Sequence, residues 1–373
     1  MLTVGGLVAL VGQMPGGALV DAARSARLMA AIAVIAIGIS ALALALWPSF
    51  TIVMASRVLH ALASCLLGPA IAAISLGLVG HAGLGERLGR NARFMSIGAG
   101  LSALAMGAAG HMLSTQSVFF ISAALAIPTV LALGRIRTRA VPPVVQLAPR
   151  VRPPDAPVAP RNLLRNRPLF VFAACILLFH LANAAMLPLM GSMMASRVSH
   201  WAAASIAACM IVPQIVVAAF SPWIGRQSVQ WGRRPLLVAA FAALTLRGLL
   251  FAVIKDPSLV ILVQVLDGIS AAVLGVMFPL IVADVTRESG RFNLALGIVG
   301  SAMGIGAAIS TTVGGYMVDH LGYVAAFAGL SAVAAIGMVL AATIMPETRP
   351  EGDAPDAMPP LRSPAVDAAR LSA

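Results

Sequence analysis

The stretch Arg57-Val58-Leu59-His60 is matched 207 residues later (264 against 57) by Gln264-Val265-Leu266-Asp267. A glycine follows each stretch at the same distance, Gly68 in the first and Gly275 in the second. The same offset pairs Arg27 with Arg234, Gly107 with Gly314 and Phe120 with Phe327. Between these anchors both halves are long apolar runs. A repeat of this size in an apolar chain is typical of membrane proteins built from two related helical halves.

The composition supports this interpretation. Hydrophobic residues make up 60% of the 373 residues and charged residues only 10%, whereas a soluble domain averages roughly 45–50% apolar and about 25% charged residues. A chain of this kind needs the bilayer as its solvent. Because about 20 apolar residues cross a membrane as a helix, we expect eleven spans. They lie at about 2–20, 28–47, 51–78, 94–113, 117–134, 168–190, 202–223, 235–254, 258–283, 292–316 and 323–345.

The helix expected at 168–190 has no counterpart in the first half, because shifting it back by the repeat offset places it before residue 1. We therefore expect an all-α membrane protein of two bundles, with five helices in the first and six in the second. The first bundle would lack one helix at its start. A wrongly chosen start codon explains this more simply than a natural protein of eleven spans.

The basic residues fix an orientation. Of the 25 Lys and Arg residues, 21 fall in loops and segments on one face of the expected membrane array. Only Arg197 and Lys255 fall on the other face, and Arg57 and Arg247 fall inside spans. Basic loops stay in the cytoplasm, so we expect a cytoplasmic C-terminus and residue 1 outside. Arginines confined to short loops also argue against nucleic-acid binding, despite the net charge of +12.

Four regions follow from these spans. Residues 1–135 form the N-terminal bundle, 136–167 a Pro- and Arg-rich cytoplasmic linker, 168–346 the C-terminal bundle and 347–373 a disordered cytoplasmic tail. Proline lacks an amide donor and arginine resists burial, so the linker is expected to be solvated. The Ala- and Arg-rich, almost Lys-free composition favours a bacterial inner membrane.

One loop carries a family signature. Gly17-Ala18-Leu19-Val20-Asp21, with Arg24 and Arg27 after it, resembles the loop motif G-x-L-x-D-R-x-G-R-K/R of the major facilitator superfamily. A second copy runs from Gly225-Arg226 to Trp231-Gly232-Arg233-Arg234. The match is incomplete, with Ala22 where the family usually has Arg, Ser25 where it has Gly, and Val229 at the second Asp position. In the family this loop follows the second helix, so the resemblance also implies that the first helix is missing.

The resemblance implies two bundles that rock around a central site in alternating access. It also implies a role for Gly17, Asp21, Arg24, Arg27, Gly225, Arg233 and Arg234 as a latch of one conformation. Glycine lets helices approach closely, and a carboxylate is favourable near a helix N-terminus. The alternative is a basic loop that serves only membrane orientation.

Charges inside the spans are the best site signals, because each costs about 2.5–3.5 kcal/mol to insert. Arg247 lies about eight residues before the turn at Lys255-Pro257, and Asp267 about ten residues after it. Adjacent antiparallel helices would bring them to similar depth. We predict an intramembrane ion pair, or a protonatable carboxylate held by arginine. A purely structural pair is the alternative.

Other polar residues are candidates for a substrate or proton pathway. Arg57 and His60 share one helix face, and the resemblance places Arg57 near an arginine that family antiporters carry in their fourth helix; snorkelling to the outer surface is the alternative. His180 and Asn183 share a face of the helix whose family counterpart lines the cavity. Gln214 and Gln264 are further cavity candidates. The alternative for each of these last four is a hydrogen bond that only holds neighbouring helices together, which is a common role of lone polar residues in membrane helices.

No Walker motif, metal cluster or catalytic triad is visible, so we expect neither an enzyme nor a cofactor or metal. Cys65, Cys175 and Cys209 sit in apolar runs without a pairing pattern. We expect a secondary active transporter of a small molecule. We expect it to be coupled to protons, because Asp267, His60 and His180 are titratable candidates inside spans. Export is slightly favoured. A sugar or organic-acid importer, and a transport-inactive receptor or scaffold on the same fold, remain alternatives. Substrate, direction, coupling ion and oligomeric state stay open.

Overall fold

The computed structural model describes residues 2–136, 166–197, 202–254, 256–287 and 289–349, and these are helical with short connections. The helices of the first half are α1 (Leu2–Ala22), α2 (Ala26–Leu46), α3 (Phe50–Val79), α4 (Leu84–Met112), α5 (Thr115–Ala124) and α6 (Ala126–Gly134). Those of the second half are α8 (Arg167–Asn183), α9 (Met186–Arg197), α10 (Ala202–Trp231), α11 (Arg233–Val253), α12 (Pro257–Thr286) and α13 (Phe292–Thr343).

The helices have the length and composition of a membrane protein. Within the described ranges, nine continuous helical segments are long and apolar enough to cross a membrane, and a shorter apolar helix covers Gly6–Ala22. One of the nine, α13, is 52 residues long and turns at Gly322, whose φ of 82° is outside the helical region. The all-α membrane fold is thereby confirmed. The count of eleven spans stays a prediction.

The ends of several helices differ from the expected spans. The run 117–134 divides at Leu125 into α5 and α6, and 168–190 becomes α8 and α9. α4 begins at Leu84, ten residues before the expected start. Its first turns are rich in Arg and Leu, which are good helix formers, so the helix continues beyond the apolar run. Hydropathy predicts which residues lie in the bilayer, but not where a helix begins or ends.

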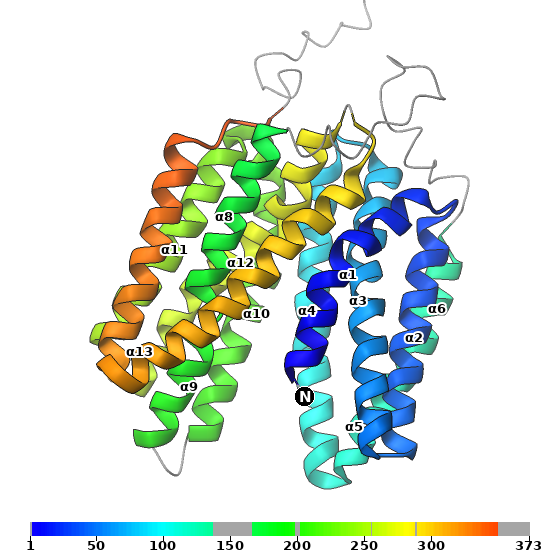
Figure 1. Cartoon of the computed structure of the whole chain (residues 1–373), viewed down its shortest axis with the longest axis horizontal. Helices are drawn as coiled ribbons and strands as arrows, with labels where there is room; N and C mark the ends of the chain where they lie inside the picture. The colour runs from blue at the N-terminus through cyan, green and yellow to red at the C-terminus, as the bar shows by residue number, and fades with distance from the viewer. Residues whose placement is uncertain (1, 137–165, 198–201, 255, 288, 350–373) are drawn as a thin grey trace, which may run out of the picture.

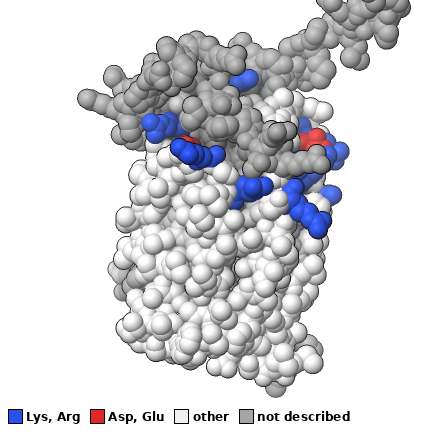
Figure 2. All heavy atoms as spheres, turned by 90° about the vertical axis from the view of Figure 1, so that its right-hand side faces the viewer, with Lys and Arg blue, Asp and Glu red and all other residues white. Residues whose placement is uncertain are grey.

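The two halves form two neighbouring groups of helices, α1–α6 and α8–α13 (Figure 1). Side chains of arginine gather at one end of the molecule (Figure 2), which we name the arginine-rich end. It carries Arg24, Arg27, Arg87, Arg90, Arg93, Arg226, Arg233, Arg234, Arg287, Arg291 and Arg349. Most of the expected linker (137–165) and of the expected tail (350–373) lies outside the described residues, and so does Lys255. The division into four regions stays a prediction.

The halves touch close to the arginine-rich end. There α1 packs on α13, and α4 packs on α10. Glycines permit both crossings: a Cβ on Gly17 would collide with the backbone of Asn293, and one on Gly225 with the backbone of Gly85. The far end of α4 lies apart from the second half (Figure 1), and Gly98 and Gly107 on that part of α4 have nothing within 4 Å of an added Cβ. The halves are thus joined at one end.

Candidate functional site

Asp21 accepts three hydrogen bonds from the other half. Its Oδ1 accepts hydrogen bonds from the Asn293 backbone amide at 3.1 Å and side-chain Nδ2 at 2.8 Å, and its Oδ2 accepts from the Leu294 amide at 2.8 Å. These amides belong to the first turn of α13, whose own N-cap residue, Arg291, supplies no side-chain cap. A carboxylate at a helix N-terminus meets unpaired donors and the positive end of the dipole. Asp21 therefore ties α1 to α13 across the joint.

The second contact between the halves is made by Arg93 on α4. Its Nε donates to the carbonyl oxygen of Ala218 on α10 at 2.8 Å, and its Nη2 lies 3.5 Å from that of Ala219. One helix turn away, a Cβ on Gly89 would collide with the Ser221 backbone. The sequence did not single out Arg93, because one arginine in a basic loop looks like any other until its helix is placed.

One contact occurs in both copies of the loop, each within its own half. Arg27 Nη1 donates to the Ile136 carbonyl oxygen at 2.6 Å, and Arg234, its counterpart in the repeat, donates to the Ala342 carbonyl oxygen. Each arginine thus binds the end of the last helix of its own half. Arg24 is exposed and has no contact to a described residue that would assign it a role.

Arg233 is buried in the second half. Its Nε donates to Asp284 Oδ2 at 2.8 Å and its Nη1 to the Ser228 carbonyl oxygen at 2.8 Å, with only 2% and 3% of the two paired side chains exposed. The amides of Arg233 and Arg234 donate to the two carboxylate oxygens of Glu347 at 2.9 and 3.1 Å. Sequence reasoning missed Asp284 and Glu347; Glu347 falls at the start of the expected tail.

A polar cluster lies inside the second half, where α11 and α12 meet the end of α8. Arg247 on α11 is 1% exposed, and its Nη1 donates both to Asp267 Oδ1 on α12 and to Asn183 Oδ1 on α8, the latter at 2.7 Å. Asp267 keeps 21% of its side chain exposed. The guanidinium also lies over the Phe251 ring, 5.4 Å from its centroid. The structure thus brings three of the sequence candidates together; their part in transport stays a prediction.

The neighbouring candidates surround this cluster without joining its hydrogen bonds. His180, one turn before Asn183, has its Nδ1 3.0 Å from the Ile176 carbonyl oxygen. Gln264, one turn before Asp267, is fully buried and approaches Cys209. Gln214 on α10 is half-buried, and it forms no hydrogen bond with the described part of the chain.

Arg57 and His60 lie on α3 of the first half, and both are exposed. Neither side chain has a hydrogen bond or ion pair to the residues that the structure describes. The repeat makes them the counterparts of Gln264 and Asp267, so each half carries a polar pair at the same level of the equivalent helix. The pairs differ in environment, since only the second has a buried arginine from a neighbouring helix, Arg247, beside it.

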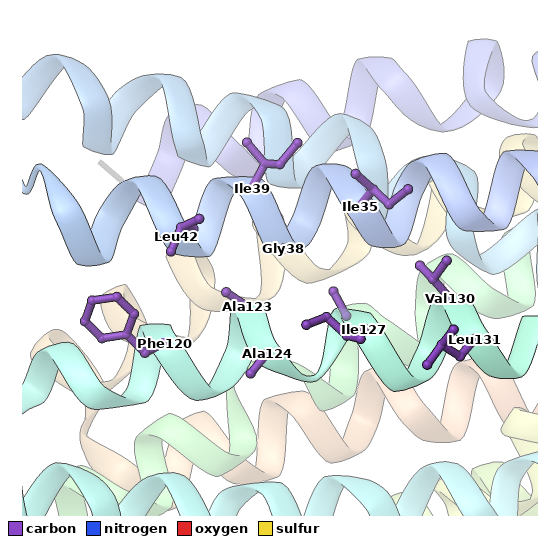
Figure 3. Close-up of a pocket in the computed structure, with 11 residues that line it drawn as sticks. Ile35, Gly38, Ile39, Leu42, Phe120, Ala123, Ala124, Ile127, Val130 and Leu131 are labelled. Atoms are coloured by element: carbon purple, nitrogen blue, oxygen red, sulfur yellow. The ribbon is translucent and has the colours of Figure 1, made fainter.

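An apolar groove of about 580 Å³ lies elsewhere, between α2 and the α5–α6 pair. Ile39 and Leu42 on α2 line it together with Phe120 on α5 and Ile127 on α6 (Figure 3). All the residues that line it are apolar. Because it offers no polar group to orient a substrate, it is separate from the candidate site.

A family model described as Major Facilitator Superfamily matches residues 1–212 and, in a second match, 174–372. This chain belongs to the major facilitator superfamily. The resemblance noted from the loop signature is confirmed. Major facilitator proteins are multi-pass membrane transporters that bind small-molecule substrates, and they are generally not enzymes.

Relatives among known proteins agree with this assignment. An uncharacterized MFS-type transporter of Mycobacterium tuberculosis is 37% identical over 351 residues, covering 93% of this chain and 84% of that protein. The class B tetracycline resistance protein of Escherichia coli is 32% identical over 97 residues, covering 26% of this chain and 24% of that protein. The crystal structure of the MFS transporter FucP in the outward conformation has a TM-score of 0.72 at 15% identity, covering 91% and 88% of the two chains.

Proposed function

We propose that this major facilitator protein is a secondary active transporter, which moves a small molecule by alternating access, is coupled to protons and works as an exporter. The observation that carries the proposal is the cluster of Arg247, Asp267 and Asn183 inside the second half. Ionised groups within a membrane bundle are costly and mark ion or substrate pathways.

The cluster suits reversible protonation. Arg247 is buried and always charged, so it needs the Asp267 carboxylate to offset its charge. Asp267 itself is partly exposed, so a proton or a cationic substrate group can reach it. Binding either one weakens the attraction between Asp267 and Arg247. A proton gradient can therefore act on the packing of α11 and α12 through this pair.

The joint at the arginine-rich end supports alternating access. The contacts of Asp21 with α13 and the glycine crossings at Gly17 and Gly225 hold one end of the halves together, while the far ends lie apart (Figure 1). If the arginine-rich end is cytoplasmic, as basic loops favour, this is a state open to the outside. Asp21 would then be a latch of that state.

The preference for export rests on the relatives. One is named for tetracycline resistance and another, in Bacillus subtilis, for multidrug resistance. Each matches about a third of this chain or less, so the preference is slight. The bacterial inner membrane and the cytoplasmic C-terminus are part of the proposal, and a reporter enzyme fused after Ala373 should be active only on the cytoplasmic side.

Flux measurements in everted membrane vesicles test the function. Tetracycline, glucose and citrate serve as probes for a drug-like molecule, a sugar and an organic acid. We expect tetracycline to accumulate when the lumen is acidified, and Asp267→Asn to abolish the dependence on the gradient. Asp256→Asn is the matched control, because Asp256 only caps the N-terminus of the same helix, α12.

The other outcomes point to the alternatives. Gradient-driven movement of glucose or citrate instead of tetracycline would indicate an importer of sugars or organic acids. No flux of any probe by correctly inserted protein would favour the receptor or scaffold. Gradient-dependent flux that survives in Asp267→Asn would remove this carboxylate from the coupling mechanism.

A further inference from the structure

The helix formed by α8 and α9 is broken beside the polar cluster. α8 ends at Asn183 and α9 begins at Met186, with Ala184 and Ala185 in a turn between them. Pro188 explains the break, because it has no amide to donate to the Ala184 carbonyl oxygen and its ring crowds that group. The Ala185 amide donates to Ser310 Oγ on α13 at 3.0 Å, rather than to the carbonyl oxygen four residues earlier in its own helix. The break is therefore a defined joint within one helix.

Asn183 connects this break to the ion pair. It is the last residue of α8, and its Oδ1 accepts from the same Arg247 nitrogen that donates to Asp267. One guanidinium nitrogen is thus shared between a carboxylate on α12 and the residue that ends α8. Neutralising Asp267 weakens its own bond to Arg247, because a charged acceptor makes the stronger hydrogen bond, and so loosens the guanidinium that also holds Asn183.

The outer segment, α9, is packed in a way that permits movement. Its inner face consists of Met186, Met190, Met193 and Met194, all buried. Methionine is unbranched and adapts its shape to changing surroundings. Met186 also lies against Gly248, the residue after Arg247, where a Cβ would come within 2.8 Å of the Met186 methyl group. A shift of Arg247 on α11 therefore meets the first turn of α9 directly.

We propose that Asn183 is a positioning residue that couples Asp267, through Arg247, to the hinge at Ala184–Ala185, so that α9 swings as a gate at the end away from the arginine-rich end. With Asp267 charged, Arg247 is held between Asp267 and Asn183, and the end of α8 is fixed against α11 and α12. With Asp267 protonated or bound to a cationic group, that restraint weakens and α9 pivots. This role rests on the alternating-access function proposed above.

Among the groups around it, Asp267 is the one whose charge can change. Arg247 faces it from α11 and Asn183 from α8, while Cys209 approaches Arg247 from α10. His180 lies one turn before Asn183 and points its Nδ1 at its own helix. Arginine keeps its charge, so Asp267 is the carboxylate through which this cluster changes its net charge.

Two spin-label distances test the proposal in the full chain in lipid nanodiscs, with the three buried native cysteines replaced by alanine. Ala195→Cys on α9 paired with Val253→Cys at the end of α11 reports the hinge, and Leu104→Cys on α4 paired with Val253→Cys reports movement between the halves. All three sites are exposed. We expect Asn183→Ala and Asp267→Asn to shift or broaden the Ala195–Val253 distance alike, by about 2 Å or more.

Ser270→Ala is the matched control, because Ser270 is a buried side chain that binds the Ala240 carbonyl oxygen between α12 and α11, outside the cluster. It should leave the Ala195–Val253 distance unchanged, and Asn183→Ala should add nothing to Asp267→Asn in the double variant. Asn183→Asp, which keeps an acceptor for Arg247, should restore the unmodified distance if Asn183→Ala folds poorly.

Three results would overturn the proposal. If the Ala195–Val253 distance is unchanged by Asn183→Ala, or changes equally in Ser270→Ala, then Asn183 has no part in the coupling. That result would not contradict alternating access. Additive effects of the two substitutions show that they act separately. A Leu104–Val253 distance with one unvarying population in every variant contradicts the alternating-access function itself, and the hinge with it.

Discussion

Two arginine side chains of the second half are almost fully buried, and one carboxylate offsets the charge of each. Arg247 pairs with Asp267 within the bundle, and Arg233 with Asp284 near the arginine-rich end. The pairs differ in exposure, because 21% of the Asp267 side chain is exposed and only 3% of the Asp284 side chain. A pair that excludes water serves packing, whereas a pair with an open carboxylate can take up a ligand or proton.

The Arg233–Asp284 pair should therefore be structural. Removing either partner leaves a buried charge without its counter-charge, which costs about 3–5 kcal/mol. We expect Asp284→Ala and Arg233→Ala to lower the Tm in detergent strongly. The apolar double variant Arg233→Met/Asp284→Leu should recover most of that loss, since both charges are then gone. A single variant as stable as the unmodified protein would contradict this.

At this scale the sequence predicts only some contacts. Arg247 and Asp267 could be paired because each interrupts an apolar run at similar depth from one turn. Asn183 could be named as a candidate, but its bond to Arg247 depends on the rotation of α8, which spacing within one helix does not determine. Asp284 and Glu347 were missed because acidic residues near helix ends usually face water.

Two helices lack a capping side chain at their own N-terminus and receive a carboxylate from elsewhere. α13 is capped by Asp21 of the first half, and α11, which follows Gly232, by Glu347 after the last helix. Both carboxylates bridge segments far apart in the sequence. The capping of a helix thus doubles as a connection between elements.

Loss of the Glu347 carboxylate should loosen the start of α11. A carboxylate at a helix N-terminus contributes about 1 kcal/mol, so Glu347→Ala should raise the hydrogen-exchange rate of the Arg233 and Arg234 amides about fivefold. Glu86→Ala is the control, because Glu86 is an exposed acid paired only within α4. Equal exchange in Glu347→Ala and the unmodified protein would show that this cap contributes nothing.

Hydropathy found the helices but not their ends or breaks. The break between α8 and α9 has a sequence signal, Pro188, yet proline is tolerated in membrane helices such as α3, where Pro69 lies within a continuous helix. The start of α4 could not be read because charged residues end an apolar run without ending a helix. Tertiary packing decides these points.

At the scale of the whole molecule, the described residues form two groups of helices joined at one end, where glycines set the distance between backbones. Gly17 lies at the closest approach of α1 and α13, and Asp21 lies one turn further along. Shape and charge thus act together at one crossing. A change in either should shift the balance between the two orientations of the halves.

Gly17→Val and Asp21→Asn should both open this joint. The valine side chain cannot fit against the Asn293 backbone, and the loss of charge at α13 costs about 1 kcal/mol, or about fivefold in population. A cysteine introduced by Ser221→Cys, buried where α4 crosses α10, should react faster with a water-soluble maleimide in both variants.

The control for the joint is Gly100→Val, because a Cβ on Gly100 meets nothing within 4 Å. It should leave the labelling rate at position 221 unchanged. Asp21→Asn with unchanged labelling would show that this carboxylate does not act as a latch, and the loop would then serve only membrane orientation.

The apolar groove between α2 and the α5–α6 pair bears on the search for the substrate. Hydrophobic compounds will bind in a groove of this kind and raise the melting temperature in a ligand screen without being transported. A hit should therefore count only if it persists when Ala124→Phe fills the groove and disappears in Asp267→Asn. These two variants thus separate transported substrates from compounds that only bind in the groove.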